Sequence, residues 1–165
     1  MRRLAFALLG VVLFLALPGC EAKDAADVAA LGPAPAFKLP LLSGGEVELE
    51  KLRGKTVILD FWATWCPPCE VQMPILDEVW RDRKDGDLMI LGVSIDTDPP
   101  ATVARWIDER GFSYPIASGD QALAVEYGIL GFPSLVVIDP SGQIQARHTG
   151  VWSREEIEDH LEAIR

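Results

Sequence analysis

Residues 60–69 read Asp-Phe-Trp-Ala-Thr-Trp-Cys-Pro-Pro-Cys, and they join a strand-like run to a helix-like one. The run over residues 56–62 is rich in β-branched and apolar side chains, which is typical of a strand buried on both faces. From Cys66 to about Arg83 the pattern is helical, and Pro74 inside it should kink the helix. The two cysteines are therefore expected where a helix leaves a buried strand.

The Cys66-Pro67-Pro68-Cys69 spacing predicts a redox-active dithiol, because the two sulfurs can bond across the first helical turn. A thiol at a helix N-terminus faces free N–H groups and the positive end of the helix dipole, which favours its thiolate. We expect Cys66, the more exposed thiol, to attack a client protein and Cys69 to resolve the mixed disulfide. An inert structural disulfide is the alternative, but such a bridge does not need this placement.

The N-terminus has the pattern of an export signal. Arg2 and Arg3 precede an uncharged run of about 14 residues, which is short for a ~30 Å hydrocarbon core but suits a signal peptide. The run ends in Leu17-Pro18-Gly19-Cys20, which resembles a bacterial lipobox whose cysteine is lipidated. We expect residues 1–20 to be a signal peptide that ends at Cys20, with ordinary signal-peptidase cleavage or an uncleaved anchor as alternatives.

The rest of the chain divides into a tether and one domain. Residues 21–35 are rich in Ala, Asp and Pro, which favours a flexible tether to the membrane. Residues 36–165 alternate between strand and helix patterns, as expected of an α/β fold with a mixed central sheet and helices on both faces. A small hairpin is expected around residues 43–49. Strands are predicted over residues 56–62, 88–95, 135–138 and 144–148, and helices over residues 66–83, about 100–110, 121–127 and after the capping box Ser153–Glu156.

Residues 60–69 resemble the active-site segment of thioredoxin-like proteins, and within that superfamily the exported, membrane-tethered TlpA/ResA branch. The resemblance extends from about residue 35 to residue 165. Supporting matches are Pro74, residues 131–134, and the strand over residues 90–96 with its following helix, which is similar to the inserted βαβ element of the branch. The resemblance implies a thioredoxin fold and thiol-disulfide oxidoreductase activity.

The same resemblance implies a client-binding surface. Pro133 matches the cis-proline that lies against the two cysteines, and the backbone of Phe132 should pair with the extended chain of a client. Trp65, the more exposed of the two active-site tryptophans, and Pro67 are expected on the same surface. The alternative for Phe132 and Pro133 is a loop that merely enters the next strand.

Two polar residues near the cysteines bear on the reaction. Asp60 matches the buried acid of thioredoxins, whose raised pKa would let it relay a proton to or from Cys69. Many TlpA/ResA-type proteins carry Asn there, so Asp60 favours a working reductase, although a solvent-exposed Asp at a strand end is the alternative. Gln72 stands where relatives that serve cytochrome c maturation carry Glu, and a Gln cannot titrate. This departure argues against a cytochrome-specific role.

Composition narrows the range of partners. The net charge is −10 without a basic cluster, which makes nucleic-acid binding a poor fit. With 3 Cys and 2 His, the chain is a poor fit to a four-ligand zinc site of the usual spacing. We expect no metal and no cofactor. The expected partners are protein thiols and disulfides, a membrane electron donor, and the membrane itself through the lipid anchor.

Two other functions of the same fold stay open as alternatives. A thiol peroxidase needs Thr or Ser three residues before its reactive Cys, and Ala63 stands at that position. A copper-binding assembly factor uses two Cys and a His, with the cysteines separated by three residues rather than the two found here. The nearest candidate ligand would be His148, on a predicted strand. Both alternatives therefore lack a residue or a spacing that they require.

Overall fold

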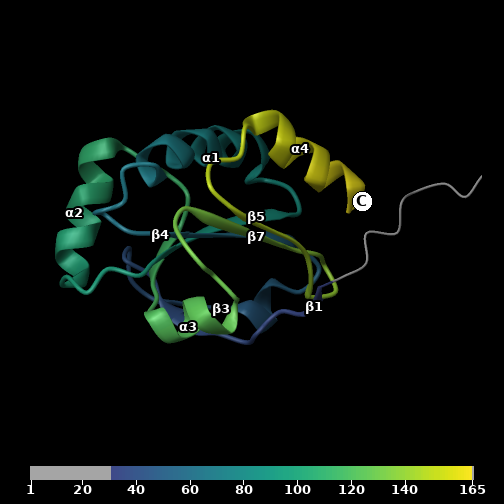
Figure 1. Ribbon diagram of the computed structural model, residues 1–165, viewed down its shortest axis with the longest axis horizontal. Coiled ribbons are helices and arrows are strands. Elements are labelled where there is room, and N and C mark those ends of the chain that lie inside the picture. Colours follow the sequence, from purple (N-terminus) through teal and green to yellow (C-terminus); the bar gives the residue numbers. More distant parts are fainter. Residues whose placement is uncertain (1–30, 165) are drawn as a thin grey trace, which may run out of the picture.

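A computed structural model describes residues 31–164, in which helices cover both faces of a six-stranded mixed sheet (Figure 1). The predicted signal peptide, with Cys20, and the first part of the predicted tether lie outside the described residues. The strands are β1 (Gly32–Pro33), β2 (Lys38–Pro40), β3 (Glu46–Glu48), β4 (Thr56–Trp62), β5 (Leu88–Ser94), β6 (Ile116–Ser118), β7 (Ser134–Ile138) and β8 (Gln143–Thr149). The helices are the 3₁₀ turn η1 (Leu49–Leu52), α1 (Cys69–Arg83), α2 (Pro100–Arg110), α3 (Gln121–Glu126) and α4 (Arg154–Ala163). None of the described helices is long and apolar enough to cross a membrane.

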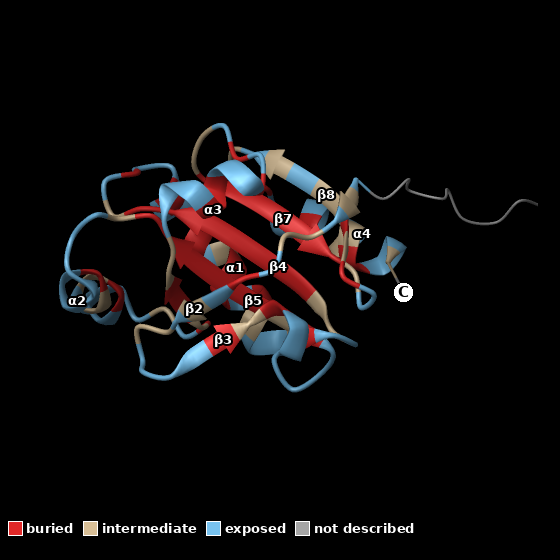
Figure 2. Cartoon of the chain, turned by 90° about the horizontal axis from the view of Figure 1, so that it is seen from below, coloured by how far each residue is buried: buried red, intermediate tan, exposed pale blue. Residues whose placement is uncertain are grey.

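Strand β4 lies inside the sheet, whose order is β1-β8-β7-β4-β5-β6. It pairs in parallel with β5 and antiparallel with β7, and Figure 2 shows these three strands almost entirely buried. Helices α1 and α4 cover one face, while α3 lies on the other (Figure 1). Burial on both faces explains why the sequences of these strands are nearly continuous apolar runs.

The mixed sheet and the thioredoxin-like architecture confirm the fold expected from the sequence. The unit β5–α2–β6 is the predicted inserted βαβ element, since both of its strands run parallel to β4. The N-terminal hairpin is formed by β2 and β3, and the final helix begins with the expected capping box at Ser153. Gly111 ends α2 in the left-handed conformation that glycine adopts without a steric penalty.

The domain begins earlier than the sequence pattern indicated. Gly32 and Pro33, assigned to the tether, form β1 and pair with Ile144 and Gln143 of β8. Farther along, the carbonyl oxygen of Pro35 accepts a 2.6 Å hydrogen bond from the Tyr127 hydroxyl. A two-residue strand leaves no alternating apolar pattern, so its sequence could not be distinguished from a linker.

Candidate active site

The two cysteines lie where β4 passes into α1, and they are joined by a disulfide with an S–S distance of 2.06 Å. Helix α1 begins at Cys69, three residues later than predicted, because Cys66 to Pro68 form a turn in which the Cys69 N–H donates to the Cys66 carbonyl. Cys66 keeps 5% of its surface exposed and Cys69 none. Cys66 is therefore the more exposed of the two cysteines.

An acid outside the motif holds the loop before the cysteines. Asp96, just after β5, accepts hydrogen bonds from the backbone N–H of Thr64 at 3.1 Å and from its hydroxyl at 2.6 Å. The Ser94 hydroxyl donates to the same carboxylate at 2.7 Å. One carboxylate thus fixes the loop two residues before Cys66. Sequence reasoning missed this role because the partners are 32 residues apart.

Replacing Asp96 with Ala should lower the free energy of unfolding by about 2–3 kcal/mol, because it removes the shared acceptor of three partly buried donors. Urea unfolding of the oxidised protein measures this effect. The matched control is Asp98→Ala, at an exposed position of the same loop, which should change stability by less than about 0.5 kcal/mol. Equal stabilities of the two variants would contradict the anchoring role of Asp96.

Asp60 is fully buried in β4, and the solvent-exposed alternative is ruled out. The hydroxyl of Tyr114 donates to its Oδ2 at 3.1 Å, while Oδ1 has no hydrogen-bond partner among the described residues. Burial raises the pKa of Asp60 to about 7, and the Tyr114 hydrogen bond opposes that rise. A carboxyl group with this pKa can accept and return a proton near neutral pH.

The exposed surface beside the disulfide is apolar. The side chain of Trp65 is 62% exposed, and its ring meets that of Phe132 edge-on at a centroid distance of 5.9 Å. The Phe132–Pro133 peptide bond is cis, as the resemblance implied, and the Pro133 carbonyl accepts from the N–H of Gly150. Leu130, two residues before Phe132, is 95% exposed. Trp65 and Phe132, both expected to contact clients, are thus brought together.

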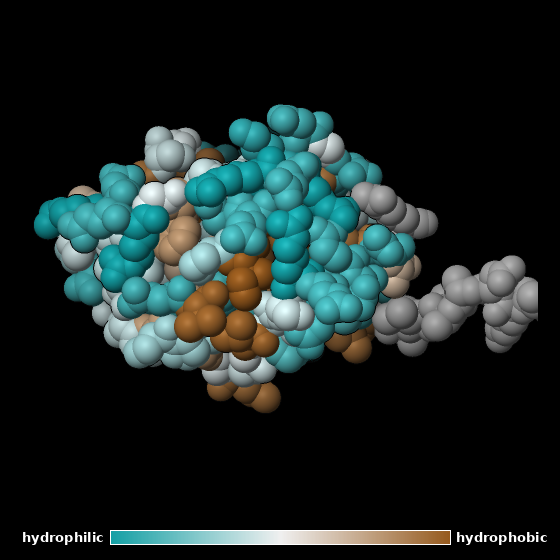
Figure 3. Space-filling model, turned by 90° about the horizontal axis from the view of Figure 1, so that it is seen from above, coloured by the Kyte–Doolittle hydropathy of each residue, from teal (hydrophilic) through white to brown (hydrophobic). Residues whose placement is uncertain are grey.

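A buried hydrogen bond at Gln72 connects α1 to the loop before α4. The buried side chain of Gln72 accepts a 2.6 Å hydrogen bond from the backbone N–H of Trp152 through its Oε1. The neighbouring side chains Val71 and Val151 are exposed, by 58% and 39%. Figure 3 shows apolar side chains gathered in one patch on the face seen from above. Gln72 therefore acts as a structural link between α1 and the loop before α4, in addition to being unable to titrate.

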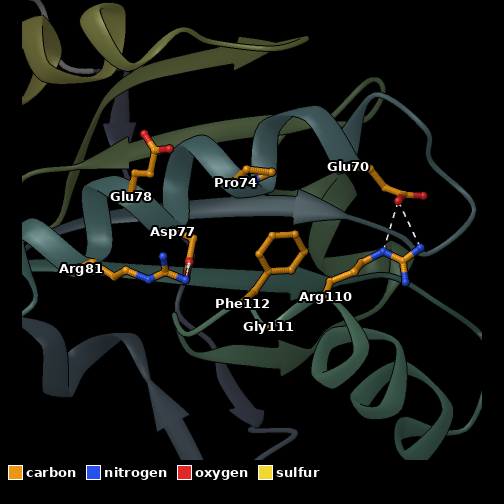
Figure 4. A pocket seen from close by; sticks show the side chains of 8 residues that line it. All are labelled: Glu70, Pro74, Asp77, Glu78, Arg81, Arg110, Gly111 and Phe112. Carbon is orange, nitrogen blue, oxygen red and sulfur yellow. Dashed lines mark hydrogen bonds and ion pairs between the residues drawn. The ribbon is translucent and has the colours of Figure 1, made fainter.

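A surface hollow beside α1 is lined by charged side chains that form ion pairs. Its volume is about 350 Å³, and it lies between α1 and the residues that end α2 (Figure 4). Arg110 donates to Glu70 at 3.1 Å, and Arg81 pairs with Asp77. Because each of these arginines already faces an acid, the hollow offers no free cation to an anionic ligand.

The chain is similar to known thiol-disulfide oxidoreductases. The family model described as AhpC/TSA family matches residues 31–147 of the chain. The chain belongs to the AhpC/TSA family. Among its relatives, the thiol-disulfide oxidoreductase ResA of Halalkalibacterium halodurans is 37% identical over 131 residues, which cover 78% of this chain and 73% of that protein. The thioredoxin-like protein YneN of Bacillus subtilis is 30% identical over 131 residues, covering 78% and 76% of the two chains.

Solved structures agree with this assignment. The crystal structure of a putative thiol:disulfide interchange protein DsbE from Chlorobium tepidum has a TM-score of 0.75 and 26% identity, with 82% of this chain and 98% of that chain covered. The exposed lipoprotein thioredoxin Etrx1 of Streptococcus pneumoniae gives a TM-score of 0.68 and 27% identity, with 78% and 98% covered. The family, these relatives and the Cys66–Cys69 pair together identify an AhpC/TSA-family, thioredoxin-like thiol-disulfide oxidoreductase.

Proposed function

We propose that this family member is an extracytoplasmic dithiol reductase, lipid-anchored at Cys20, that reduces disulfides in client proteins. The observation that carries the proposal is the geometry at the start of α1. There a disulfide joins the slightly exposed Cys66 to the fully buried Cys69, and the buried acid Asp60 lies in β4, the strand that leads into this turn. Accessible and inaccessible sulfurs suit the two successive steps of a thiol exchange.

The proposed reaction proceeds through a mixed disulfide. In the reduced protein the Cys66 thiolate attacks one sulfur of a client disulfide, which releases the other client sulfur as a thiolate. The Cys69 thiol then gives its proton to the Asp60 carboxylate and attacks the Cys66 sulfur, which releases the second client thiolate. Two electrons pass to the client, its thiolates take up protons, and the Cys66–Cys69 disulfide forms. An electron donor in the membrane restores the dithiol.

The residues around the cysteines support the reductive direction. Pro67 and Pro68 stand between the cysteines, where oxidases and isomerases often place a His that stabilises the thiolate and makes the disulfide oxidising. Asp60, with a pKa of about 7, supplies the base that the resolving step requires. Together these features favour a protein that gives electrons to its clients.

Sequence features at the N-terminus support the proposed location. Arg2 and Arg3, the apolar run and Cys20 form the pattern of a lipoprotein signal. One structural relative, from Streptococcus pneumoniae, is described as an exposed lipoprotein. We propose that residues 1–20 direct export, and that the segment up to about residue 30 separates the domain from the membrane surface.

The apolar surface beside the disulfide favours proteins as the substrates. We propose that Trp65, Pro67 and Phe132 contact the client chain, and that the backbone next to Pro133 pairs with it. Exposed apolar side chains of this size are characteristic of interaction surfaces. Their position around the accessible sulfur of Cys66 would hold a client disulfide close to it.

The two sequence alternatives gain no support from this site. Ala63 has no hydroxyl that could orient a peroxide, and its carbonyl already accepts from the N–H of Cys66. His148 stacks on Trp152 at a centroid distance of 4.9 Å, and the residues from 31 to 164 contain no group of three donor side chains arranged for a metal ion. Dithiol exchange is the reaction that this arrangement favours.

The reduction potential of the Cys66–Cys69 pair tests the proposed direction. The full chain, purified in detergent, would be equilibrated with defined dithiothreitol or glutathione ratios, and its free thiols counted by mass-tagging. A potential near about −270 mV supports a reductant. A potential near about −120 mV would make the protein an oxidant and overturn the proposed direction. A pair that never opens would show that the bridge is structural.

A further inference from the structure

A tyrosine from a distant part of the chain contacts the buried acid. Tyr114 lies between α2 and β6, is 2% exposed, and its hydroxyl donates to Asp60 Oδ2 at 3.1 Å. The partners are 54 residues apart in the sequence. No other hydrogen bond to the Asp60 side chain occurs within the described residues, so this hydroxyl alone fixes the orientation of the carboxyl group.

The fold makes room for this contact at one glycine. Gly92 of β5 is the direct neighbour of Asp60 in the β4–β5 ladder. A Cβ atom there would lie 3.1 Å from Cε2 of Tyr114 and 2.5 Å from Cδ1 of Ile116. A side chain at residue 92 would force Ile116 to shift and would crowd the Tyr114 ring, so glycine at this position leaves the ring its place beside the carboxyl group.

Neighbouring bonds hold the tyrosine in place on both sides. The N–H and the hydroxyl of Ser113 donate to Asp77 of α1, at 2.6 and 2.8 Å. On the other side, the Pro115 carbonyl accepts from the N–H of Gly92 at 2.9 Å. Tyr114 is therefore fixed between the helix that begins at Cys69 and the strand beside Asp60.

We propose that Tyr114 is a positioning residue for the thiol exchange: its hydroxyl orients Asp60 and stabilises the carboxylate that takes the proton from Cys69. The inference rests on the proposed function, in which Asp60 is that base. A hydrogen bond to the charged form of an acid lowers its pKa, and here it opposes the rise that burial causes. Burial raises the pKa of Tyr114 most, and the charges of Asp60 and Asp77 raise it further. In the proposed function the other ionisable group that acts on the pair is Cys69, when it is reduced.

The test compares two tyrosine-to-phenylalanine variants of the full chain in detergent. Tyr114→Phe removes the hydroxyl that faces Asp60, whereas Tyr127→Phe removes a buried hydroxyl that donates to Pro35 instead. The first readout is the carboxyl-carbon NMR titration of Asp60 in the disulfide form. The second is the rate at which the reduced protein resolves a mixed disulfide with a model peptide, measured in single turnovers from pH 5.5 to 9.

Tyr114→Phe should raise the titration midpoint of Asp60 by roughly one pH unit and slow resolution at pH 7 roughly fivefold, with recovery at alkaline pH. Tyr127→Phe should keep the wild-type midpoint and rate. In an Asp60→Asn background, the change at Tyr114 should have no further effect on the rate, because the base it serves is absent.

The Asp60→Asn and Tyr114→Phe variants distinguish a failure of the proposed function from a failure of the Tyr114 proposal. If Asp60→Asn resolves the mixed disulfide as fast as the wild type at every pH, the Asp60 step of the proposed function fails, and the role of Tyr114 falls with it. If Asp60→Asn is slow but Tyr114→Phe keeps the wild-type midpoint or rate, the Tyr114 proposal alone is overturned.

Discussion

Replacing Cys66 with Ser should slow disulfide exchange by roughly three orders of magnitude or more, because the attacking thiolate is lost. The hydroxyl of Ser does not ionise near neutral pH, so no mixed disulfide can begin to form. The measurement is the rate at which the protein reduces a model protein disulfide with dithiothreitol as the electron source. The fold should persist, since the substitution changes one atom at a position that keeps some exposure.

Cys69→Ser is the matched comparison. Cys66 can still attack, but the mixed disulfide cannot be resolved, so a covalent complex with the client should accumulate. Mass spectrometry of the unreduced mixture detects this complex, which should be absent for Cys66→Ser. If complexes accumulate with Cys66→Ser and not with Cys69→Ser, the two sulfurs have the opposite roles.

Asp60→Asn should stabilise the oxidised protein by about 4 kcal/mol at pH 8 and leave its stability at pH 3 nearly unchanged. Burial raises the pKa of Asp60 in the folded state to about 7, against an ordinary value of 3.8 for an aspartate side chain. Below the lower of these two pKa values, the Asp60 carboxyl is protonated in both the folded and the unfolded state, so it does not lower the free energy of unfolding. As the pH rises to about 7, the unfolded chain loses this proton while the folded protein keeps it, so the free energy of unfolding falls. A difference of about three pKa units between the two states corresponds to about 4 kcal/mol.

Urea unfolding of the disulfide form at several pH values measures this effect. The side-chain oxygen of Asn can still accept the Tyr114 hydrogen bond, so packing is preserved. The exposed Asp98 provides a control, because Asp98→Asn should show no such pH-dependent gain. If the Asp60→Asn protein is no more stable than the wild type at pH 8, the buried carboxyl does not carry the penalty that its surroundings imply.

Local patterns were sufficient to predict the dithiol and most of the fold. The apolar run of β4, the Cys66–Cys69 spacing and the capping box at Ser153 each depend on neighbouring residues, and each is confirmed. The cis bond at Pro133 was expected from family resemblance and not from local physics. Local signals therefore located the reacting sulfurs and the order of the elements.

Side chains that meet only after folding could not be predicted. The bonds from Tyr114 to Asp60 and from Asp96 to Thr64 join residues 54 and 32 positions apart, and no periodic pattern marks them. The sequence marks Gln72 only as a residue that cannot titrate, whereas its buried side-chain oxygen accepts a hydrogen bond from the backbone N–H of Trp152. These contacts are set by strand order and register, which determine which distant residues become neighbours.

The short segment that follows residue 31 closes the sheet at both ends. Strand β1 covers the open side of β8. Directly after β2, Leu41 bridges to Ala117 of β6, and the Leu42 N–H donates to the Ile116 carbonyl. Uncovered outer strands offer free backbone groups to other molecules and promote self-association. A version of the protein trimmed to start at β4 would keep both cysteines but lose this cover, and it should aggregate at concentrations where the intact domain stays monodisperse.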